Sequence, residues 1–357
     1  MKVSILGNGL TTLALAKLLV NQGIKVDIFS DQKIKKYTKT QTLGISKSNI
    51  DFFNKNILNI KKSLWDINKI EIFSENLKNE KIIKFDNNGK ILFSVIKNFE
   101  LYHQLYSNLN KNKLINFKKK ISYQNLIKRN YKLIFNCDHQ NLITKKFFFK
   151  KINKNYNSFA YVTIIKHKSL SQNNIASQIF TKRGPLAFLP ISPTETSIVY
   201  SVTGKKDINF KSLIKKYNKK YKISKMYKSI SFEIKSSSLR SYYNGNIIAF
   251  GDLLHKLHPL AGQGFNMTIR DMKKIYDLIE SKKEHGLDID SSICLDFEKC
   301  IRDKNYLFSS GIDFIYEFFN FENKFNTNTF SKLVKFFGKN RIIKFFFTKF
   351  ADNGILI

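Results

Sequence analysis

The chain opens with a buried strand, a glycine turn and a helix, and this unit restricts its fold more than any other feature. Residues 3–6 are mostly apolar, as in a strand covered on both faces. Gly7-Asn8-Gly9 interrupts them, and residues 10–21 are rich in Leu and Ala, which predicts a buried helix. A second strand is predicted over residues 24–29. A strand, a helix and a second strand in this order form a βαβ unit, so the sequence predicts a parallel sheet.

The rest of the chain carries two further patterns. A helix is predicted near residues 49–58 and another near 99–109, and residues 131–136 and 247–250 are two more buried strands. Shorter strand-like runs lie at residues 69–73, 81–85 and 89–95. Four more predict an antiparallel sheet inserted into this α/β framework: residues 159–165, 175–180, 186–189 and 197–202. After Asp252 the chain is mainly helical, so a helical C-terminal region completes the predicted architecture.

Composition bears on partners and on location. The formal net charge of +35 suits a polyanion, but Lys, Asn, Ile and Phe are raised along the whole chain, and no nucleic-acid-binding motif accompanies them. We therefore predict no specific nucleic-acid partner, and a nucleic-acid binder stays an alternative supported by charge alone. The cysteines, Cys137, Cys294 and Cys300, show no metal-ligand spacing, so we predict reduced thiols, no metal site and a cytoplasmic protein.

The first candidate site is the glycine turn itself. Gly7 permits a tight turn, and Gly9 lets the backbone N–H groups at the start of the helix approach a pyrophosphate. Leu10 and Thr11 carry those N–H groups. The turn lies between a strand and a helix at the start of a βαβ unit, which is where a dinucleotide binds.

The second candidate site lies in residues 246–271, with the sequence NIIAFGDLLHKLHPLAGQGFNMTIRD. A buried strand ends in Gly251-Asp252, where a carboxylate can accept hydrogen bonds from a ribityl chain. A loop with Pro259 follows, and Gly262-Gln263-Gly264 then begins a helix. The free N–H groups and the positive dipole end of such a helix stabilise a reduced, anionic flavin ring.

This segment resembles the second flavin-binding motif of the group A flavoprotein monooxygenases, the para-hydroxybenzoate hydroxylase superfamily. The run HPLAGQGFN followed by RD is typical of the ubiquinone-biosynthesis hydroxylases, which act on 2-polyprenylphenols and 6-methoxyphenols. Residues 180–190 (FTKRGPLAFLP) are similar to a segment of that family's substrate domain, and residues 295–304 (LDFEKCIRDK) stand where the family has a conserved helical segment.

The resemblance implies a Rossmann-like FAD-binding domain with an inserted antiparallel β-sheet substrate domain and a helical C-terminus. We predict that residues 1–64, 97–150 and 245–290 form the FAD-binding domain, that residues 65–96 and 151–244 form the substrate domain, and that residues 291–357 form the helical region. The implied activity is hydroxylation of a polyprenylated phenol by dioxygen, through a flavin hydroperoxide on FAD that NADPH or NADH has reduced.

The resemblance also implies the site residues. Four residues of the inserted sheet, Phe180, Leu186, Phe188 and Pro190, are predicted to face the substrate. The predicted FAD contacts are Gly7, Gly9, Leu10, Thr11, Asp31, Gln41, Asp138, Gly251, Asp252, Pro259, Gly262, Gln263, Gly264, Phe265 and Asn266.

Several of these positions depart from the family pattern. Thr12 replaces the third glycine of the fingerprint, and Ser30-Asp31 replaces the acid that ends the second strand. Gln41 stands in place of an arginine, and Asp138-His139 in place of an Asp-Gly pair. All four lie in the motifs for the adenine end of FAD. They motivate a second hypothesis, in which the chain is a weakened flavoprotein that acts as a structural partner in a quinone-synthesis assembly.

Two further features allow more than one interpretation. His255 and His258 flank the flavin loop; an acid–base role is open to them, but we favour a role in shaping the loop. Residues 307–350 interleave Phe and Ile with Lys and Arg. This stretch suits attachment to the inner face of an anionic cytoplasmic membrane, and equally a helical cover on the flavin domain.

Overall fold

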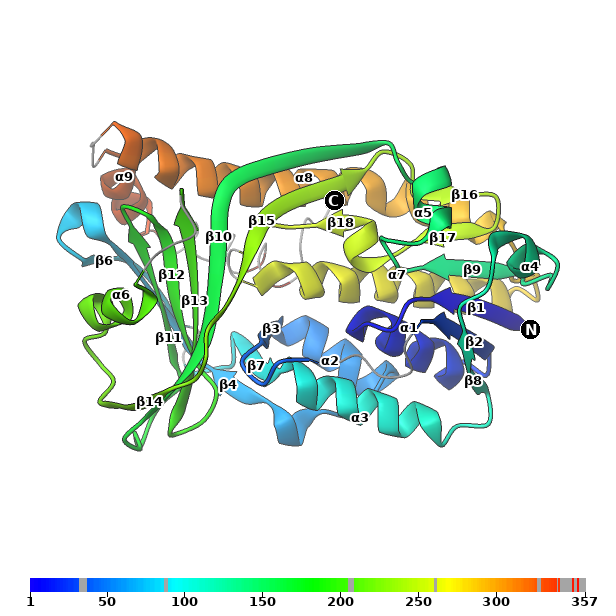
Figure 1. Ribbon diagram of the computed structural model, residues 1–357, viewed down its shortest axis with the longest axis horizontal. Coiled ribbons are helices and arrows are strands. Elements are labelled where there is room, and N and C mark those ends of the chain that lie inside the picture. Colours follow the sequence, from blue (N-terminus) through cyan, green and yellow to red (C-terminus); the bar gives the residue numbers. More distant parts are fainter. Residues whose placement is uncertain are drawn as a thin grey trace.

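A six-stranded sheet at one end of the molecule contains the N-terminal strand (Figure 1). The computed structural model describes residues 1–31, 37–86, 89–204, 209–259, 262–325 and 329–338 and the single residues 340, 349 and 352. Neighbouring strands pair in parallel except for β16 and β17. The strand order is β16 (Tyr243–Asn244), β17 (Ile247–Ala249), β9 (Leu133–Asn136), β1 (Lys2–Leu6), β2 (Lys25–Ser30) and β8 (Ile115–Lys119). The predicted parallel sheet is thus confirmed.

Helix α1 (Leu10–Asn21) connects β1 to β2 and buries nine of its residues. Its Leu15 and Leu18 are fully buried, in one core with Ile5 of β1 and Phe135 of β9. Helix α3 (Asn98–Asn110) packs beside α1 and adds Leu101 and Leu105 to that core. The short helices α4 (Tyr123–Ile127) and α5 (Leu142–Phe147) flank β9 in the chain. The parallel strands are covered on both faces, which explains their almost continuous apolar runs.

A nine-stranded sheet forms the other end of the molecule, as Figure 1 shows. Its pairs are antiparallel apart from β5 with β11, so the predicted inserted sheet is confirmed with that one parallel contact. The order is β18 (His255–Lys256), β15 (Ile230–Leu239), β10 (Lys151–His167), β13 (Glu195–Thr203), β12 (Gly184–Pro190), β11 (Ile175–Thr181), β5 (Lys69–Ser74) and β6 (Glu80–Asp86), and β14 (Ile223–Met226) pairs with β10.

A three-stranded sheet lies between the two larger ones. It consists of β3 (Thr42–Ser46), β7 (Phe93–Lys97) and β4 (Trp65–Ile67), and helix α2 (Lys47–Asn56) follows β3. Each large sheet is built from separate stretches of the chain. The domain division stays a prediction; within it, β4 and β7 pair with β3 rather than with the nine-stranded sheet, and β18 pairs with β15 of that sheet.

Three helices follow the strands. Helix α7 (Gln263–Glu284) crosses the middle of the molecule, α8 (Ser292–Lys324) runs alongside it over both sheets, and α9 (Thr329–Phe337) packs on β6 (Figure 1). The predicted helical C-terminal region is present within the described residues. None of the helices in this described part is long and apolar enough to cross a membrane.

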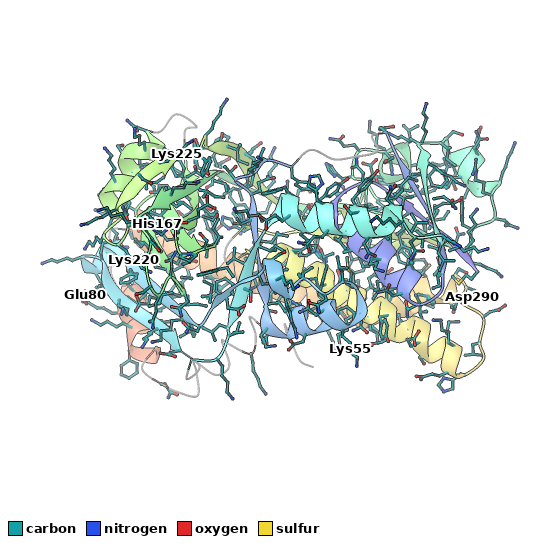
Figure 2. The ribbon with its side chains drawn as sticks, turned by 90° about the horizontal axis from the view of Figure 1, so that it is seen from below. Lys55, Glu80, His167, Lys220, Lys225 and Asp290 are labelled. Atoms are coloured by element: carbon teal, nitrogen blue, oxygen red, sulfur yellow. The ribbon has the colours of Figure 1, made fainter. Side chains whose placement is uncertain are left out.

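Packed side chains fill the end of the nine-stranded sheet that lies away from the parallel sheet. Figure 2 shows His167 and Lys220 at this end, far from Asp290. The His167 ring is hydrogen-bonded at both nitrogens, to the Lys168 carbonyl at 2.9 Å and to Thr196 Oγ1 at 3.0 Å. Helix α6 (Phe210–Tyr217) covers the same face of the sheet with Phe210 and Ile214. This face is therefore a packed core.

The parallel sheet depends on one buried carboxylate. Asp27 of β2 is fully buried and accepts hydrogen bonds from Lys118 Nζ at 2.6 Å and Asn116 Nδ2 at 2.9 Å. Tyr131 donates to it as well, and Lys2 Nζ lies 3.0 Å away. These contacts hold the pKa of Asp27 at about 2, against the opposing effect of burial. The carboxylate therefore joins β1, β2 and β8 through charge as well as through backbone pairing.

We expect Asp27→Asn to lower the free energy of unfolding by about 2 to 4 kcal/mol, because the lysines around it lose a buried counter-charge. Denaturant unfolding measures the change. Asp31→Asn is the matched control: Asp31 pairs with Lys120 at 2.9 Å, but its side chain is 68% exposed, so the expected change is below about 1 kcal/mol. Equal effects of the two substitutions would contradict the role given to Asp27.

Candidate functional site

A cavity of about 460 Å³ lies where the start of α7 meets β3 and one face of the nine-stranded sheet. This volume is in the range of small-molecule sites. Nine predicted site residues line it and come from two distant stretches of sequence: Gln41, Asp252, His258, Pro259, Gly262, Gln263, Gly264, Phe265 and Asn266. The structure therefore brings together most of the predicted flavin motif around a single space.

The start of α7 faces this cavity with free backbone donors. Gly262 precedes the helix at φ +65°, a left-handed conformation that favours glycine. Gly262, as the N-cap residue, has no side chain to cap the helix, and the first turn contains no acidic residue. The Oε1 atom of Gln263 is buried and has no hydrogen-bond partner among the described residues. These uncapped N–H groups, with the positive end of the helix dipole, suit a ligand that carries negative charge.

Asn266 holds this helix start in place. Its Nδ2 donates to the Gly44 carbonyl at 2.9 Å, and its Oδ1 accepts from Ser46 N at 2.9 Å and from Asn49 Nδ2 at 3.0 Å. Residues of β3 and α2 therefore satisfy both the donor and the acceptor of the Asn266 amide. Asn266 lines the cavity, but its polar atoms position the walls rather than point to a ligand.

The two predicted glycine motifs meet directly. Gly251 has φ +66°, and a Cβ atom there would lie 2.6 Å from Thr11 Cγ2, so no larger residue fits without a shift. Asp252 follows in the turn after β17, is exposed and lines the cavity. The close contact places the start of α1 against the turn that carries the carboxylate, although Thr11 and Gly251 are 240 positions apart in sequence.

The two histidines have different surroundings. His255 is buried, and its Nε2 lies 2.5 Å from Asp271 Oδ2, which places its ring within the protein core rather than in the cavity lining. An acid–base role for His255 at this cavity is therefore not supported. His258 lines the cavity and packs against two tyrosine rings. Its ring centre lies 4.9 Å from that of Tyr156 and 4.3 Å from that of Tyr316. Burial, with a smaller effect of Lys154, lowers the pKa of His258 to about 4. His258 is therefore neutral at pH 7.

The predicted substrate residues do not line the cavity. Leu186 and Phe188 of β12 belong to the core under α6, and Pro190 is buried at the end of that strand. Phe180 of β11 packs against Met267 and Phe308. The cavity is lined instead by Pro185, Ala187 and Leu189. Alternate residues of a strand face opposite sides of a sheet, so β12 lines the cavity with the residues next to the predicted ones.

The remaining predicted contacts lie apart from the cavity. Gly7 has φ +123° in the turn after β1, with Gly9 just before α1. Asp138 follows β9, and its Oδ1 accepts a hydrogen bond from Gln140 N at 2.8 Å. Asp31 is exposed and paired with Lys120. Leu10 N donates to the hydroxyl of Tyr37 at 3.1 Å, a contact that no sequence pattern indicated. Gly7, Gly9, Leu10, Thr11, Asp31 and Asp138 are not among the cavity's lining residues.

Two solved structures share this fold. The uric-acid-bound and FAD-bound HpxO of Klebsiella pneumoniae aligns over 99% of the chain and 97% of its own, with a TM-score of 0.75 and 11% identity. The p-nitrophenol 4-monooxygenase PnpA of Pseudomonas putida covers 99% and 98%, with a TM-score of 0.76 and 12% identity. The chain therefore has the fold of the FAD-dependent monooxygenases.

Curated proteins with a similar sequence include ubiquinone biosynthesis monooxygenases. The mitochondrial ubiquinone biosynthesis monooxygenase COQ6 of Schizosaccharomyces pombe is 23% identical over 276 residues, which are 63% of the chain and 57% of that protein. The Saccharomyces cerevisiae COQ6 is 38% identical over 65 residues, 18% of the chain and 14% of that protein. The chain spans about half the length of the curated relatives it matches. No family model matches the chain. The predicted resemblance to the ubiquinone-biosynthesis hydroxylases is confirmed.

The low pKa of His258 predicts a pH-dependent contribution to stability. An unfolded histidine titrates near pH 6.5, so between pH 6.5 and 4 the unfolded state binds a proton that folded His258 does not. Stability therefore falls as the pH is lowered through this window, by about 3 kcal/mol from this group. We expect the difference in unfolding free energy between wild type and His258→Gln to shrink by this amount from pH 7 to pH 4. A difference that stays constant across this range would contradict the assignment.

Proposed function

We propose that the chain is a flavin-dependent monooxygenase that uses FAD, with NADPH or NADH as reductant, to hydroxylate the ring of a polyprenylated phenol. The observation that carries this proposal is the cavity in which the uncapped start of α7, the Asp252 carboxylate and an apolar sheet face meet. The relatives support it as well, since those named above are all monooxygenases. Their names favour an enzyme over a purely structural partner.

The residues around the cavity fit the ring end of a flavin. Bound there, FAD supplies the electron transfer and the activation of dioxygen. The N–H groups that begin α7 stabilise negative charge on the ring. The buried Gln263 Oε1 is an acceptor without a partner among the described residues, and it suits a ring N–H. Asp252 accepts hydrogen bonds from a ribityl chain.

The opposite wall suits a phenol with an apolar tail. It contains apolar side chains of several strands, namely Ile70, Phe85, Leu92, Phe93, Val162, Ala187, Leu189 and Phe232. Such a wall excludes water from the reacting ring, which protects the reduced cofactor from side reactions. Ser177, Gln178 and Lys256 add polar groups that orient a phenol hydroxyl. We assign substrate contact to Pro185, Ala187 and Leu189 in place of the residues predicted from sequence.

We also infer that the protein acts at an anionic membrane surface, where a polyprenylated substrate resides. Three aromatic side chains along α8 and at its end, Phe314, Phe321 and Phe325, are between 52 and 67% exposed. Phe336 of α9 is 71% exposed, and Lys324 and Lys332 lie in the same helices. Exposed aromatic residues among lysines are typical of helices that bind the interface of a bilayer. Assembly with other quinone-synthesis proteins is part of the same proposal.

The helix start can be tested with Gly264→Ala. A Cβ atom at Gly264 would meet no atom of the described residues within 4 Å outside its own helix turn, and alanine favours a helix. The variant should therefore be as stable as the wild type or more stable by about 0.5 kcal/mol. The added methyl group narrows the space for a flavin, and we expect roughly tenfold weaker FAD binding. Absorbance after incubation with FAD and desalting measures binding, and thermal unfolding measures stability. Unchanged FAD binding would argue against a flavin at this position.

The substrate wall can be tested with two neighbouring residues of β12. Ala187→Phe fills the cavity, so we expect the KM for a polyprenylphenol in substrate-stimulated NADPH oxidation to rise roughly tenfold while FAD binding is retained. Phe188→Leu is the control on the opposite face, where the change lowers stability by about 1 kcal/mol and leaves KM unchanged. A higher KM for Phe188→Leu, with no change for Ala187→Phe, would place the substrate on the face predicted from sequence.

A further inference from the structure

The side chain of Tyr37 occupies the start of α1. Its hydroxyl accepts a hydrogen bond of 3.1 Å from Leu10 N, the first N–H group of the helix. In a βαβ dinucleotide site, N–H groups at this helix start bind a phosphate oxygen. A phosphate oxygen bound to the same N–H would lie about 2.9 Å from it, in the place that the hydroxyl takes.

A second contact fixes the position of that hydroxyl independently. A Cβ atom built on Gly9 would have the Tyr37 hydroxyl 3.7 Å away as its nearest neighbour. The absence of a side chain at Gly9 is the feature that lets a diphosphate approach the backbone in such a turn. In this chain, the space above Gly9 is filled by Tyr37.

Packing against α3 holds Tyr37 in this position. Its ring packs against that of Tyr102 of α3, with the ring centres 5.1 Å apart, and Tyr102 is 1% exposed. Burial raises the pKa of Tyr37 to about 12, so the hydroxyl keeps its proton at neutral pH. The group over α1 is therefore neutral.

The carboxylate at the adenosine end of the predicted site also has a partner within the protein. Asp31, the nearest carboxylate to the end of β2 for a ribose, pairs with Lys120 at 2.9 Å. The cavity at the start of α7, by contrast, contains the buried Gln263 Oε1, which has no hydrogen-bond partner among the described residues, and Tyr37 is not among its lining residues. The ring half of a flavin site is open, while the diphosphate half is filled by the chain itself.

We propose that Tyr37 is an internal substitute for the diphosphate, so that this chain recognises the isoalloxazine ring and ribityl chain of a flavin and gains little affinity from the ADP part. The proposal rests on the proposed flavin function and defines which part of the cofactor is recognised. FAD enters only when Tyr37 leaves Leu10 N, and that displacement offsets the contacts that the diphosphate makes. Riboflavin, which lacks the diphosphate, binds without displacing Tyr37.

The test is the ratio of the dissociation constants of riboflavin and FAD, measured by quenching of flavin fluorescence. In the wild type we expect the two constants to agree within about threefold. Tyr37→Phe removes the competing hydroxyl and keeps the ring on Tyr102, and the ratio should rise about threefold to tenfold, the size of one neutral hydrogen bond. Tyr37→Ala removes the ring as well, and the ratio should rise further while riboflavin binding stays constant.

Tyr106→Phe is the matched control. Tyr106 stacks on the same Tyr102 ring, with the centres 6.2 Å apart, so this variant also removes a hydroxyl from the aromatic row, and its ratio should equal that of the wild type. If Tyr37→Ala does not fold, as judged by circular dichroism, Tyr37→Phe alone decides the question.

The outcomes separate this inference from the proposed function. If both flavins bind and the ratio is the same in wild type and in the Tyr37 variants, the inference is wrong and the flavin function stands. The same conclusion follows if wild type prefers FAD by a hundredfold or more. If neither flavin binds to any variant, the proposed function fails, and the inference fails with it.

Discussion

The buried amide of Asn266 is the contact on which the rest of the site depends. It joins the first turn of α7 to the Gly44 carbonyl of β3 and to Ser46 N at the start of α2, with each bond at 2.9 Å. A buried amide is costly unless its donor and acceptor are satisfied, and here one orientation satisfies both. This network therefore fixes the direction in which the N–H groups of α7 point. It also fixes the distance between the helix and the small sheet, which forms one wall of the cavity.

The close approach of Gly251 to Thr11 positions the start of α1, as Asn266 positions the start of α7. It allows the turn after β17 to lie against the start of α1, and a side chain at residue 251 would separate them. The two glycine motifs, which are distant in sequence, thereby become one continuous edge of the parallel sheet. Ligands of open α/β sheets bind at the carboxyl ends of the strands, and this edge is where those ends lie.

The two halves of this edge have different properties. Around α7 the backbone donors, the Gln263 acceptor and the apolar sheet face are left available, which is the condition of a preorganised binding site. Around α1 the corresponding donor is already bonded to Tyr37 and the acid is paired with Lys120. Of the four substitutions in the adenine-end motifs, Ser30-Asp31 takes part in these contacts through Lys120, whereas Gln41 lines the ring cavity. A chain with this fold can keep its ring site while its phosphate site is filled from within.

The sequence by itself determined the opening βαβ unit, the two main sheets and most of the segments that line the cavity, because glycine turns, apolar runs and strand alternation are local properties of the chain. Strands β8 and β15, which belong to those sheets, were not predicted. It did not determine which side of β12 faces the cavity. That choice depended on α6, whose Phe210 and Ile214 cover the side bearing Leu186 and Phe188. Nor did it show that His255 pairs with Asp271 or that Tyr37 reaches Leu10, since both contacts join residues from different elements. Tertiary structure decided these points because a side chain's role follows from the neighbours that packing brings to it.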